Sequence, residues 1–338
     1  MNPHPMVNFR YHIVSLVAVF LALAIGVVMG STVIDRVTVE TLEAQQDRLD
    51  TNLTNARAAN RKVSGDLDDL RQASSQMARE AGDRLVAGSL LDVPVLLLGI
   101  RGNEPSGRKE LIEGLAQANA RVVATLWLTE RFQLHDPDEQ KSLGELLGVD
   151  EKSPTRLRRV GLERLGAALR SLALGEVTPD AGLPTALTDA DFLELDAEGG
   201  GEAPAIGPGT RIVLAVAPGN QGGSSPDDEV TAADKAVGET VATLTRALVG
   251  GEQAPIDLVV AEAAVTDQPE RARLIESLRD DKSPAGRFST VDNLDEPIGR
   301  TACLLALRDL GVDAVGHYGS GPGASRLIPP LPPPAPGD

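Results

Sequence analysis

Val93-Pro94-Val95-Leu96-Leu97-Leu98-Gly99-Ile100 is the first of six short apolar runs in the second part of this 338-residue chain. A run of this length without charged residues is typical of a strand that is buried on both faces of a parallel sheet. Five further runs follow at residues 121–128, 211–217, 256–261, 288–292 and 313–317. Helical patterns separate them at residues 108–119, 138–147, 156–174, 229–248, 268–279 and 297–310. This alternation predicts an α/β domain with a doubly wound, mostly parallel sheet over residues 89–326.

Three stretches of this part are rich in glycine, proline or acidic residues and predict irregular structure. Residues 198–209 and 218–228 interrupt the alternation and are expected to form surface loops. Residues 327–338 carry a run of prolines and are expected to form a disordered tail.

Upstream of this domain, residues 35–88 carry a heptad pattern that predicts a coiled coil. The expected core consists of apolar residues at both heptad core positions, with one asparagine among them: Leu42, Leu49, Leu53, Ala56, Asn60, Val63, Leu67, Leu70 and Met77. A buried asparagine at an a position sets the register and favours two strands, so the pattern predicts a parallel homodimer. The alternative is that this helix folds back on its own α/β domain and uses the same apolar stripe.

Residues 13–34 contain no charged side chain and follow a short tail at residues 1–12. As a helix, this segment is slightly longer than the hydrocarbon core of a bilayer, so it predicts a transmembrane helix. Cleavage as a signal peptide remains an alternative. Small residues recur at every fourth position and predict close helix packing in the membrane. These residues are Ala18, Ala22, Gly26 and Gly30.

The expected topology is a single pass, with the N-terminus in the cytoplasm and the C-terminal domain outside it, in the cell envelope. The tail before the span has Arg10 and no acidic residue, which favours the cytoplasmic side. Positive residues also follow the span, but long domains are translocated largely regardless of their charge.

The composition argues against a nucleic-acid partner. Asp and Glu number 49 against 32 Lys and Arg, which gives a net charge of −17, whereas phosphate binding depends on clustered cations. Cys303 is the only cysteine, so an intrachain disulfide is excluded. Because Cys303 lies within an apolar helical pattern, we expect a buried core residue rather than a reactive thiol.

No enzyme motif is present, and the sequence predicts a protein that is not an enzyme. The turn after the first strand matches neither a dinucleotide fingerprint nor a P-loop, and nucleophile elbows and zinc motifs are absent. One group of residues is a candidate for binding a small ligand or a partner loop, because the carboxyl ends of parallel strands share one sheet edge. It consists of Asp292, Asp295, His317 and Tyr318. Alternatively, Asp295 caps the helix that begins near Pro297, and the nearby glycines form turns.

No cofactor is expected, and no established metal site is evident. Copper prefers closely grouped Cys, Met or His ligands. The densest such group is Met1, His4, Met6 and His12, in the tail before the membrane helix.

Four segments carry a resemblance to a known family. They are Arg10-Tyr11-His12-Ile13-Val14-Ser15-Leu16, Ala22-Leu23-Ala24-Ile25-Gly26-Val27-Val28-Met29-Gly30-Ser31, Ser289-Thr290-Val291-Asp292-Asn293-Leu294-Asp295 with the following Gly299-Arg300-Thr301-Ala302, and Gly316-His317-Tyr318-Gly319. The sequence resembles the actinobacterial MctB family in these segments and over nearly its whole length.

This resemblance implies copper transport or a channel at the mycobacterial outer membrane, with copper as the transported ion. Relatives called SteB imply an alternative, a coiled-coil scaffold in cell division that regulates peptidoglycan hydrolases through a protein partner. Neither supplies metal-ligand positions that transfer to this sequence.

Overall fold

A computed structural model describes residues 9–196, 206–218, 232–250, 257–264, 274–280, 288–312 and 314–331. The side chains of residues 9, 31–44, 47 and 232–234 are not described. The chain divides into two units, Met1–Gln72 and Ala73–Asp338. Residues 1–8, 197–205, 219–231, 251–256, 265–273, 281–287, 313 and 332–338 lie outside the described residues. They include much of the two predicted loops and of the predicted tail, and the first residues of the strands predicted at 256–261 and 313–317.

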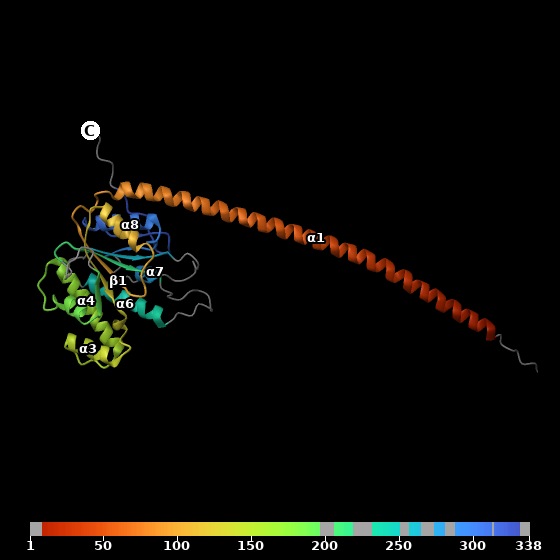
Figure 1. Cartoon of the computed structure of the whole chain (residues 1–338), viewed down its shortest axis with the longest axis horizontal. Helices are drawn as coiled ribbons and strands as arrows, with labels where there is room; N and C mark the ends of the chain where they lie inside the picture. Colours follow the sequence, from red (N-terminus) through yellow and green to blue (C-terminus); the bar gives the residue numbers. More distant parts are fainter. Residues whose placement is uncertain are drawn as a thin grey trace, which may run out of the picture. The chain divides into compact units, whose positions relative to one another are not determined.

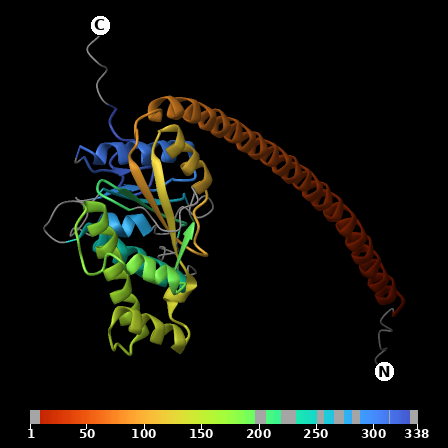
Figure 2. The ribbon, with the colours of Figure 1, turned by 60° about the vertical axis from the view of Figure 1, so that its left-hand side comes forward.

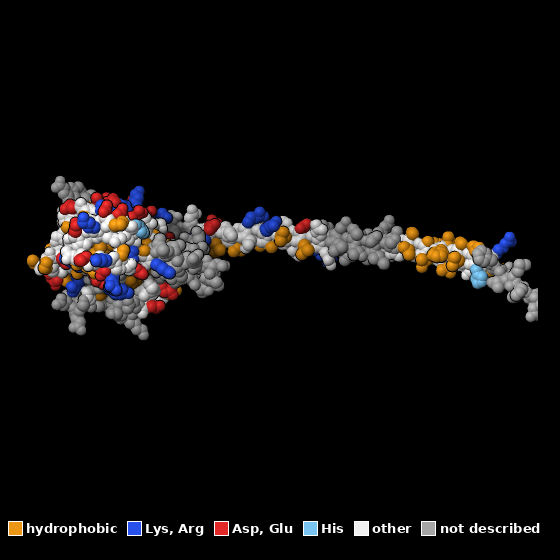
Figure 3. Space-filling model, turned by 90° about the horizontal axis from the view of Figure 1, so that it is seen from below, with side chains coloured by type: hydrophobic (Ala, Val, Ile, Leu, Met, Phe, Trp, Pro, Cys, Tyr) orange, Lys and Arg blue, Asp and Glu red, His pale blue; other side chains and the backbone are white. Residues whose placement is uncertain are grey.

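The first helix, α1 (Phe9–Val86), is 78 residues long and contains no proline (Figure 1). Its Arg10–Gly30 segment is long and apolar enough to cross a membrane, and it begins three residues before the predicted span. Figure 3 shows apolar side chains gathered along this part of the helix. The predicted membrane and coiled-coil segments therefore belong to one continuous helix.

The second unit contains a seven-stranded sheet in the order β3-β2-β1-β4-β5-β6-β7 (Figures 1 and 2). Its strands are β1 (Pro94–Ile100), β2 (Arg121–Leu128), β3 (Leu193–Asp196), β4 (Arg211–Val216), β5 (Leu258–Glu262), β6 (Ser289–Val291) and β7 (His317–Tyr318). All neighbouring strands are parallel except β2 and β3. The predicted α/β class and mostly parallel sheet are confirmed.

The antiparallel edge strand β3 was not predicted. Its sequence, Leu193-Glu194-Leu195-Asp196, alternates apolar and polar residues, as expected for a strand with one exposed side. The segment is too short to stand out in the sequence, and only its pairing with β2 makes it a strand. Two short elements before it were also missed, η1 (Glu130–Gln133) and α5 (Leu183–Asp189).

The last strand is displaced from its prediction at residues 313–317. β7 begins at His317 because it pairs only with Thr290 and Val291 of the short strand β6. Hydrogen bonding to a neighbour, rather than apolar character, sets the ends of such an edge strand.

Helices cover both faces of the sheet. They are α2 (Arg108–Gln117), α3 (Pro137–Leu147), α4 (Pro154–Leu174), α6 (Ala232–Val249), α7 (Leu274–Asp280) and α8 (Pro297–Leu310). One apolar core joins the sheet to α2, α8 and Val86 at the end of α1, and the other joins it to α3, α4, α5, α6 and α7. Cys303 lies in the first core with 0% exposure, which confirms the predicted core role.

Candidate functional site

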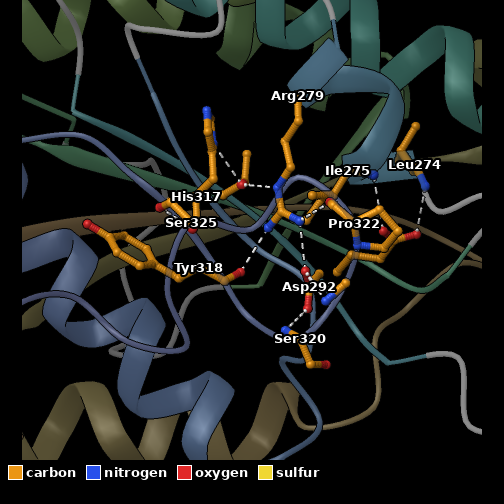
Figure 4. Close-up of polar contacts among 12 residues, drawn as sticks. Leu274, Ile275, Arg279, Asp292, His317, Tyr318, Ser320, Pro322 and Ser325 are labelled. Carbon is orange, nitrogen blue, oxygen red and sulfur yellow. Dashed lines mark hydrogen bonds and ion pairs between the residues drawn. The ribbon is translucent and has the colours of Figure 1, made fainter.

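The carboxyl ends of β6 and β7 bring three of the four predicted edge residues together. Thr290 pairs with His317 and Val291 pairs with Tyr318 in the parallel ladder. Asp292 follows β6 directly and therefore lies beside the end of β7, as Figure 4 shows.

Arg279 of α7 occupies the centre of this cluster (Figure 4). Its Nη1 donates to Asp292 Oδ2 at 2.8 Å, and both side chains are almost fully buried, with 3% and 0% exposure. The guanidinium also donates to Thr290 Oγ1 through Nε, to the Tyr318 carbonyl through Nη2 and to the Pro322 carbonyl through Nη1, each at 2.8 Å. Such extra hydrogen bonds offset the cost of burying an ion pair.

Asp292 holds the turn that follows β7. Its Oδ1 accepts from the Ser320 amide at 2.9 Å, and its Oδ2 accepts from the Gly321 amide at 3.0 Å. Gly319 has φ +124°, and a Cβ there would lie 2.1 Å from Asp292 Oδ1. Only glycine fits this close approach of backbone to carboxylate. The segment that Asp292 binds in this structure is thus a turn of its own chain.

His317 and Tyr318 complete the cluster in different ways. His317 Nδ1 lies 3.0 Å from Thr290 Oγ1, the same hydroxyl that accepts from Arg279. The Tyr318 side chain is buried against Gly316, and burial raises the pKa of its phenol above the ordinary value. Binding of an external ligand or partner loop by these residues stays a prediction.

Asp295 lies apart from the cluster. Its Oδ1 accepts from the Ala264 amide at 2.5 Å, so it ties the segment before α8 to the end of β5. The N-cap of α8 is Glu296, whose side chain makes no cap hydrogen bond. The predicted capping role of Asp295 is therefore wrong, because the N-cap is one residue further along the chain and the Asp295 carboxylate binds the Ala264 amide instead.

Sequence reasoning missed two buried charged residues that organise this edge, Arg279 and Glu262. Glu262 ends β5 with 0% exposure and accepts from the first amides of α7, Leu274 at 3.2 Å and Ile275 at 3.1 Å. A carboxylate at a helix N-terminus is stabilised by the free N–H groups there. The sequence signal was a glutamate directly after the wholly apolar run Leu258–Ala261.

A second polar cluster lies over Trp127 of β2. The guanidinium carbons of Arg101 and Arg108 lie 4.4 and 4.8 Å from the ring centroid. Arg101 pairs with Glu194 and Arg108 pairs with Asp196, both on β3. The hydrogen bond from Arg101 lowers the pKa of the Glu194 carboxyl. These contacts attach the antiparallel edge strand to the loop after β1 and to the start of α2.

A cavity of about 470 Å³ lies between α2, α8 and the last turns of α1. Its charged lining residues include Arg79, Glu110, Glu113, Asp295 and Arg300. Arg300 donates to the Asp295 carbonyl at 2.7 Å, and burial lowers the pKa of its guanidinium. Asp83 and Glu296 also line it, so five carboxylates face two cations and the lining of this cavity is net negative.

The described residues contain no group of three or more His, Cys, Asp or Glu that could hold a metal ion. His12 lies in α1, His135 precedes α3, and His317 is hydrogen-bonded to Thr290. These three histidines therefore do not form one group. Met1, His4 and Met6 of the predicted tail group lie outside the described residues.

The predicted membrane-packing and coiled-coil residues all lie on α1. Ala18, Ala22 and Gly26 are exposed, and a Cβ at Gly26 or Gly30 would meet no atom within 4 Å. The apolar coil residues with described side chains are about half exposed or more: Leu49 68%, Leu53 50%, Val63 55%, Leu67 47%, Leu70 66% and Met77 74%. Ala56 and Asn60 are exposed too, and the side chain of Leu42 is not described. The homodimer stays a prediction.

Known proteins are similar to this chain over almost all of the elements described above. The family model described as "Copper transport outer membrane protein, MctB" matches residues 6–329. Proteins named copper transporter MctB from Mycobacterium tuberculosis H37Rv and Mycobacterium bovis are 29% identical to the chain over 344 residues, which covers 95% of the chain and 99% of each relative. The candidate span, the segment predicted to form a coiled coil and the α/β domain are therefore all parts of the shared sequence, and the chain belongs to the MctB family.

Proposed function

We propose that this chain is a membrane-anchored, non-enzymatic protein that takes part in copper transport and copper homeostasis at the cell envelope. The observation that carries this proposal is the family match over residues 6–329, which includes both the apolar helix and the whole sheet. The two relatives named copper transporters are similar over the same extent. Copper is the cargo in this proposal and not a resident cofactor.

Copper handling in this proposal belongs to the assembled protein. The described part of one chain offers no three-ligand group, and copper requires several soft or imidazole ligands in close range. A parallel homodimer would bring two copies of His12, and of the tail before it, to the same membrane surface. The exposed apolar stripe of α1 supports such a dimer, because burying these side chains against a second copy removes apolar surface from water.

The proposed topology has the N-terminus in the cytoplasm and the α/β domain outside it. The candidate span Arg10–Gly30 supports a single crossing near the N-terminus. The family is described as an outer membrane protein, whereas a cytoplasmic N-terminus requires a crossing of the inner membrane, and fractionation of the two membranes decides between them.

The proposal is tested in a strain that lacks the chain. We expect growth to become copper-sensitive and cellular copper to rise, and we expect the full chain to restore both. A chain that lacks residues 1–34 is the matched control and should restore neither. Normal copper content together with abnormal septa in the deletion strain would reject copper transport in favour of the division scaffold.

A second test measures binding directly. Copper(I) titration of the purified full-length chain in detergent, with a competing chelator, should show binding that needs His12 and the residues before it. His12→Ala should weaken it, whereas His135→Ala, an exposed histidine far along the chain, should not. If the two variants bind copper(I) equally well, His12 and the residues before it do not take part in copper binding.

A further inference from the structure

A groove of about 550 Å³ lies between α4 and α6, on the face of the sheet opposite α8. Its lining carries five cationic side chains and one carboxylate: Arg156, Arg158, Arg159, Lys235, Arg246 and Glu239. The whole chain has a net charge of −17, so this concentration of positive charge runs against the composition of the protein. A groove of this volume is the size of a small-molecule site.

The two helices run in the same direction along the groove. Arg158 Nη2 donates to Glu239 Oε2 at 2.9 Å, and eight residues further along each helix a Cβ on Gly166 would lie 2.5 Å from Ala247 Cβ. Because α6 connects the parallel neighbours β4 and β5, it runs antiparallel to them and begins at their carboxyl ends. Both N-termini therefore lie at the sheet edge where open α/β domains bind ligands.

The N-terminus of α4 lacks a side-chain cap from its N-cap residue, and the one carboxylate bound there is Glu151, whose Oε1 accepts from the Ser153 backbone amide at 2.8 Å. Ser153 is its N-cap and makes no side-chain cap bond, and the first turn contains no acidic residue. In α3, by contrast, Asp136 and Glu139 form a complete capping box. Arginines in the first turns of α4 are unfavourable next to the positive end of the helix dipole, and a bound anion would relieve this repulsion.

The cations of the groove divide into fixed and available groups. Arg158 is held by Gln133 Oε1 at 2.9 Å and by Glu239, with only 13% of its side chain exposed. Arg156 and Lys235 are exposed, and neither has a carboxylate within 4.0 Å among the described residues. Arg159 makes only a 3.9 Å contact with Glu163. Three cations are thus positioned to contact a ligand.

From this arrangement we propose that the α4–α6 groove binds a multiply charged phosphate group. Arginine pairs with phosphate oxygens through two parallel N–H donors, and the free first-turn amides of Thr155 and Arg156 add further donors. The charged group belongs either to a soluble phosphate compound or to a phosphorylated lipid headgroup. The lining of this groove reaches Ser277 of α7 but includes none of Arg279, Asp292 and His317.

The test uses the full-length chain in nanodiscs of phosphatidylcholine. Inorganic pyrophosphate is titrated by calorimetry into the wild type and into the double variant Arg156→Gln with Lys235→Gln. We expect the double variant to bind about 10- to 100-fold more weakly, because two charge-assisted contacts are lost. Both residues are exposed, so circular dichroism should show an unchanged fold.

The matched control removes two exposed cations elsewhere, with Lys109→Gln and Arg121→Gln. It should bind pyrophosphate like the wild type. Absence of binding by the wild type, an unchanged affinity in the double variant, or an equal loss in the control would each overturn the proposal.

A second titration, with the short-chain lipid dihexanoylphosphatidic acid, distinguishes the two sources. Tighter binding of the lipid than of pyrophosphate, abolished in the double variant, supports a lipid headgroup. The reverse order supports a soluble phosphate compound.

Discussion

At the scale of single residues, the buried pair of Arg279 and Asp292 is the main polar anchor at the β6–β7 edge. Burying two charges is costly, and the pair is tolerated because Thr290, two carbonyls and two amides pair with most of the remaining donors and acceptors. The network connects α7, β6 and the turn after β7. The network fixes the positions of these three elements relative to one another.

Replacing Arg279 with Met should lower the free energy of unfolding by about 3–5 kcal/mol, because the Asp292 carboxylate then stays buried without its partner. Adding Asp292→Asn should recover a large part of this loss, since the unpaired charge is removed. Chemical denaturation of the full chain in detergent measures both variants. As a control, Lys141→Gln removes one partner of the exposed ion pair between Lys141 and Glu145. This substitution should lower the free energy of unfolding by less than about 1 kcal/mol. Additive losses in the double variant would contradict the pairing.

Cys303 provides a prediction of pH dependence. Burial raises the pKa of its thiol from 9.0 to about 12. The unfolded chain therefore loses this proton at lower pH than the native chain, and the stability from Cys303 is complete below about pH 9 and is lost as the pH rises towards 12. Relative to Cys303→Ala, the wild type should lose about 1.4 kcal/mol per pH unit in this window, measured by denaturant unfolding. A difference that is constant with pH would contradict the buried thiol.

At the scale of elements, the last turns of α1 are part of the α/β unit. Val86 lies in its core, and Gly82 packs so closely on α8 that a Cβ would lie 2.3 Å from Thr301 Oγ1. Thr301 is held in this rotamer by its bond to the Pro297 carbonyl at 3.0 Å. Glycine is a poor helix former, so its presence here is explained by the contact rather than by local propensity.

Two glycine substitutions in α1 should have opposite effects. Gly82→Gln should lower the free energy of unfolding of the α/β unit by about 2 kcal/mol, because its side chain meets α8. Gly65→Gln should raise helix stability by about 0.5–1 kcal/mol, because nothing lies within 4 Å of a Cβ there. Thermal unfolding followed by circular dichroism compares the two. If both substitutions stabilise the protein, the last turns of α1 do not pack on α8.

The coiled-coil prediction also belongs to this scale. In a fragment that begins at Asp35, Leu49→Asp with Leu70→Asp should give monomers, because two charges enter the apolar core of the dimer. Ala58→Asp with Gln72→Asp adds the same charges at outer heptad positions and should leave the dimer intact. Light scattering measures the mass of each. A wild-type fragment that is monomeric, or a dimer that survives the core substitutions, would reject the coil.

At the scale of the whole molecule, the chain combines a candidate membrane span with an acidic α/β domain. A chain that lacks residues 1–34 should move from the membrane to the soluble fraction, because the only candidate span in the described residues is removed. Mass spectrometry of the purified full chain should find the N-terminal segment still attached. Loss of this segment in the mature protein would support a signal peptide instead.

The sequence alone predicted the features that depend on local periodicity. The apolar segment at residues 13–34, the heptads from Leu42 to Met77 and the alternation of apolar runs with helical patterns each repeat over short distances, so they can be read without knowing the fold. Parallel strand ends share an edge, and for this reason Asp292, His317 and Tyr318 were expected together and are found together.

Tertiary structure alone decided the features that depend on distant partners. β3 is a strand because β2 lies beside it, Arg279 is buried because Asp292 and the turn after β7 surround it, and Asp295 turns to Ala264 rather than to α8. The α4–α6 groove exists because the two helices lie side by side and run in the same direction, although more than fifty residues of the chain separate them. Each of these contacts joins segments that are far apart in the chain. The sequence pattern of one segment does not show which other segment it will contact.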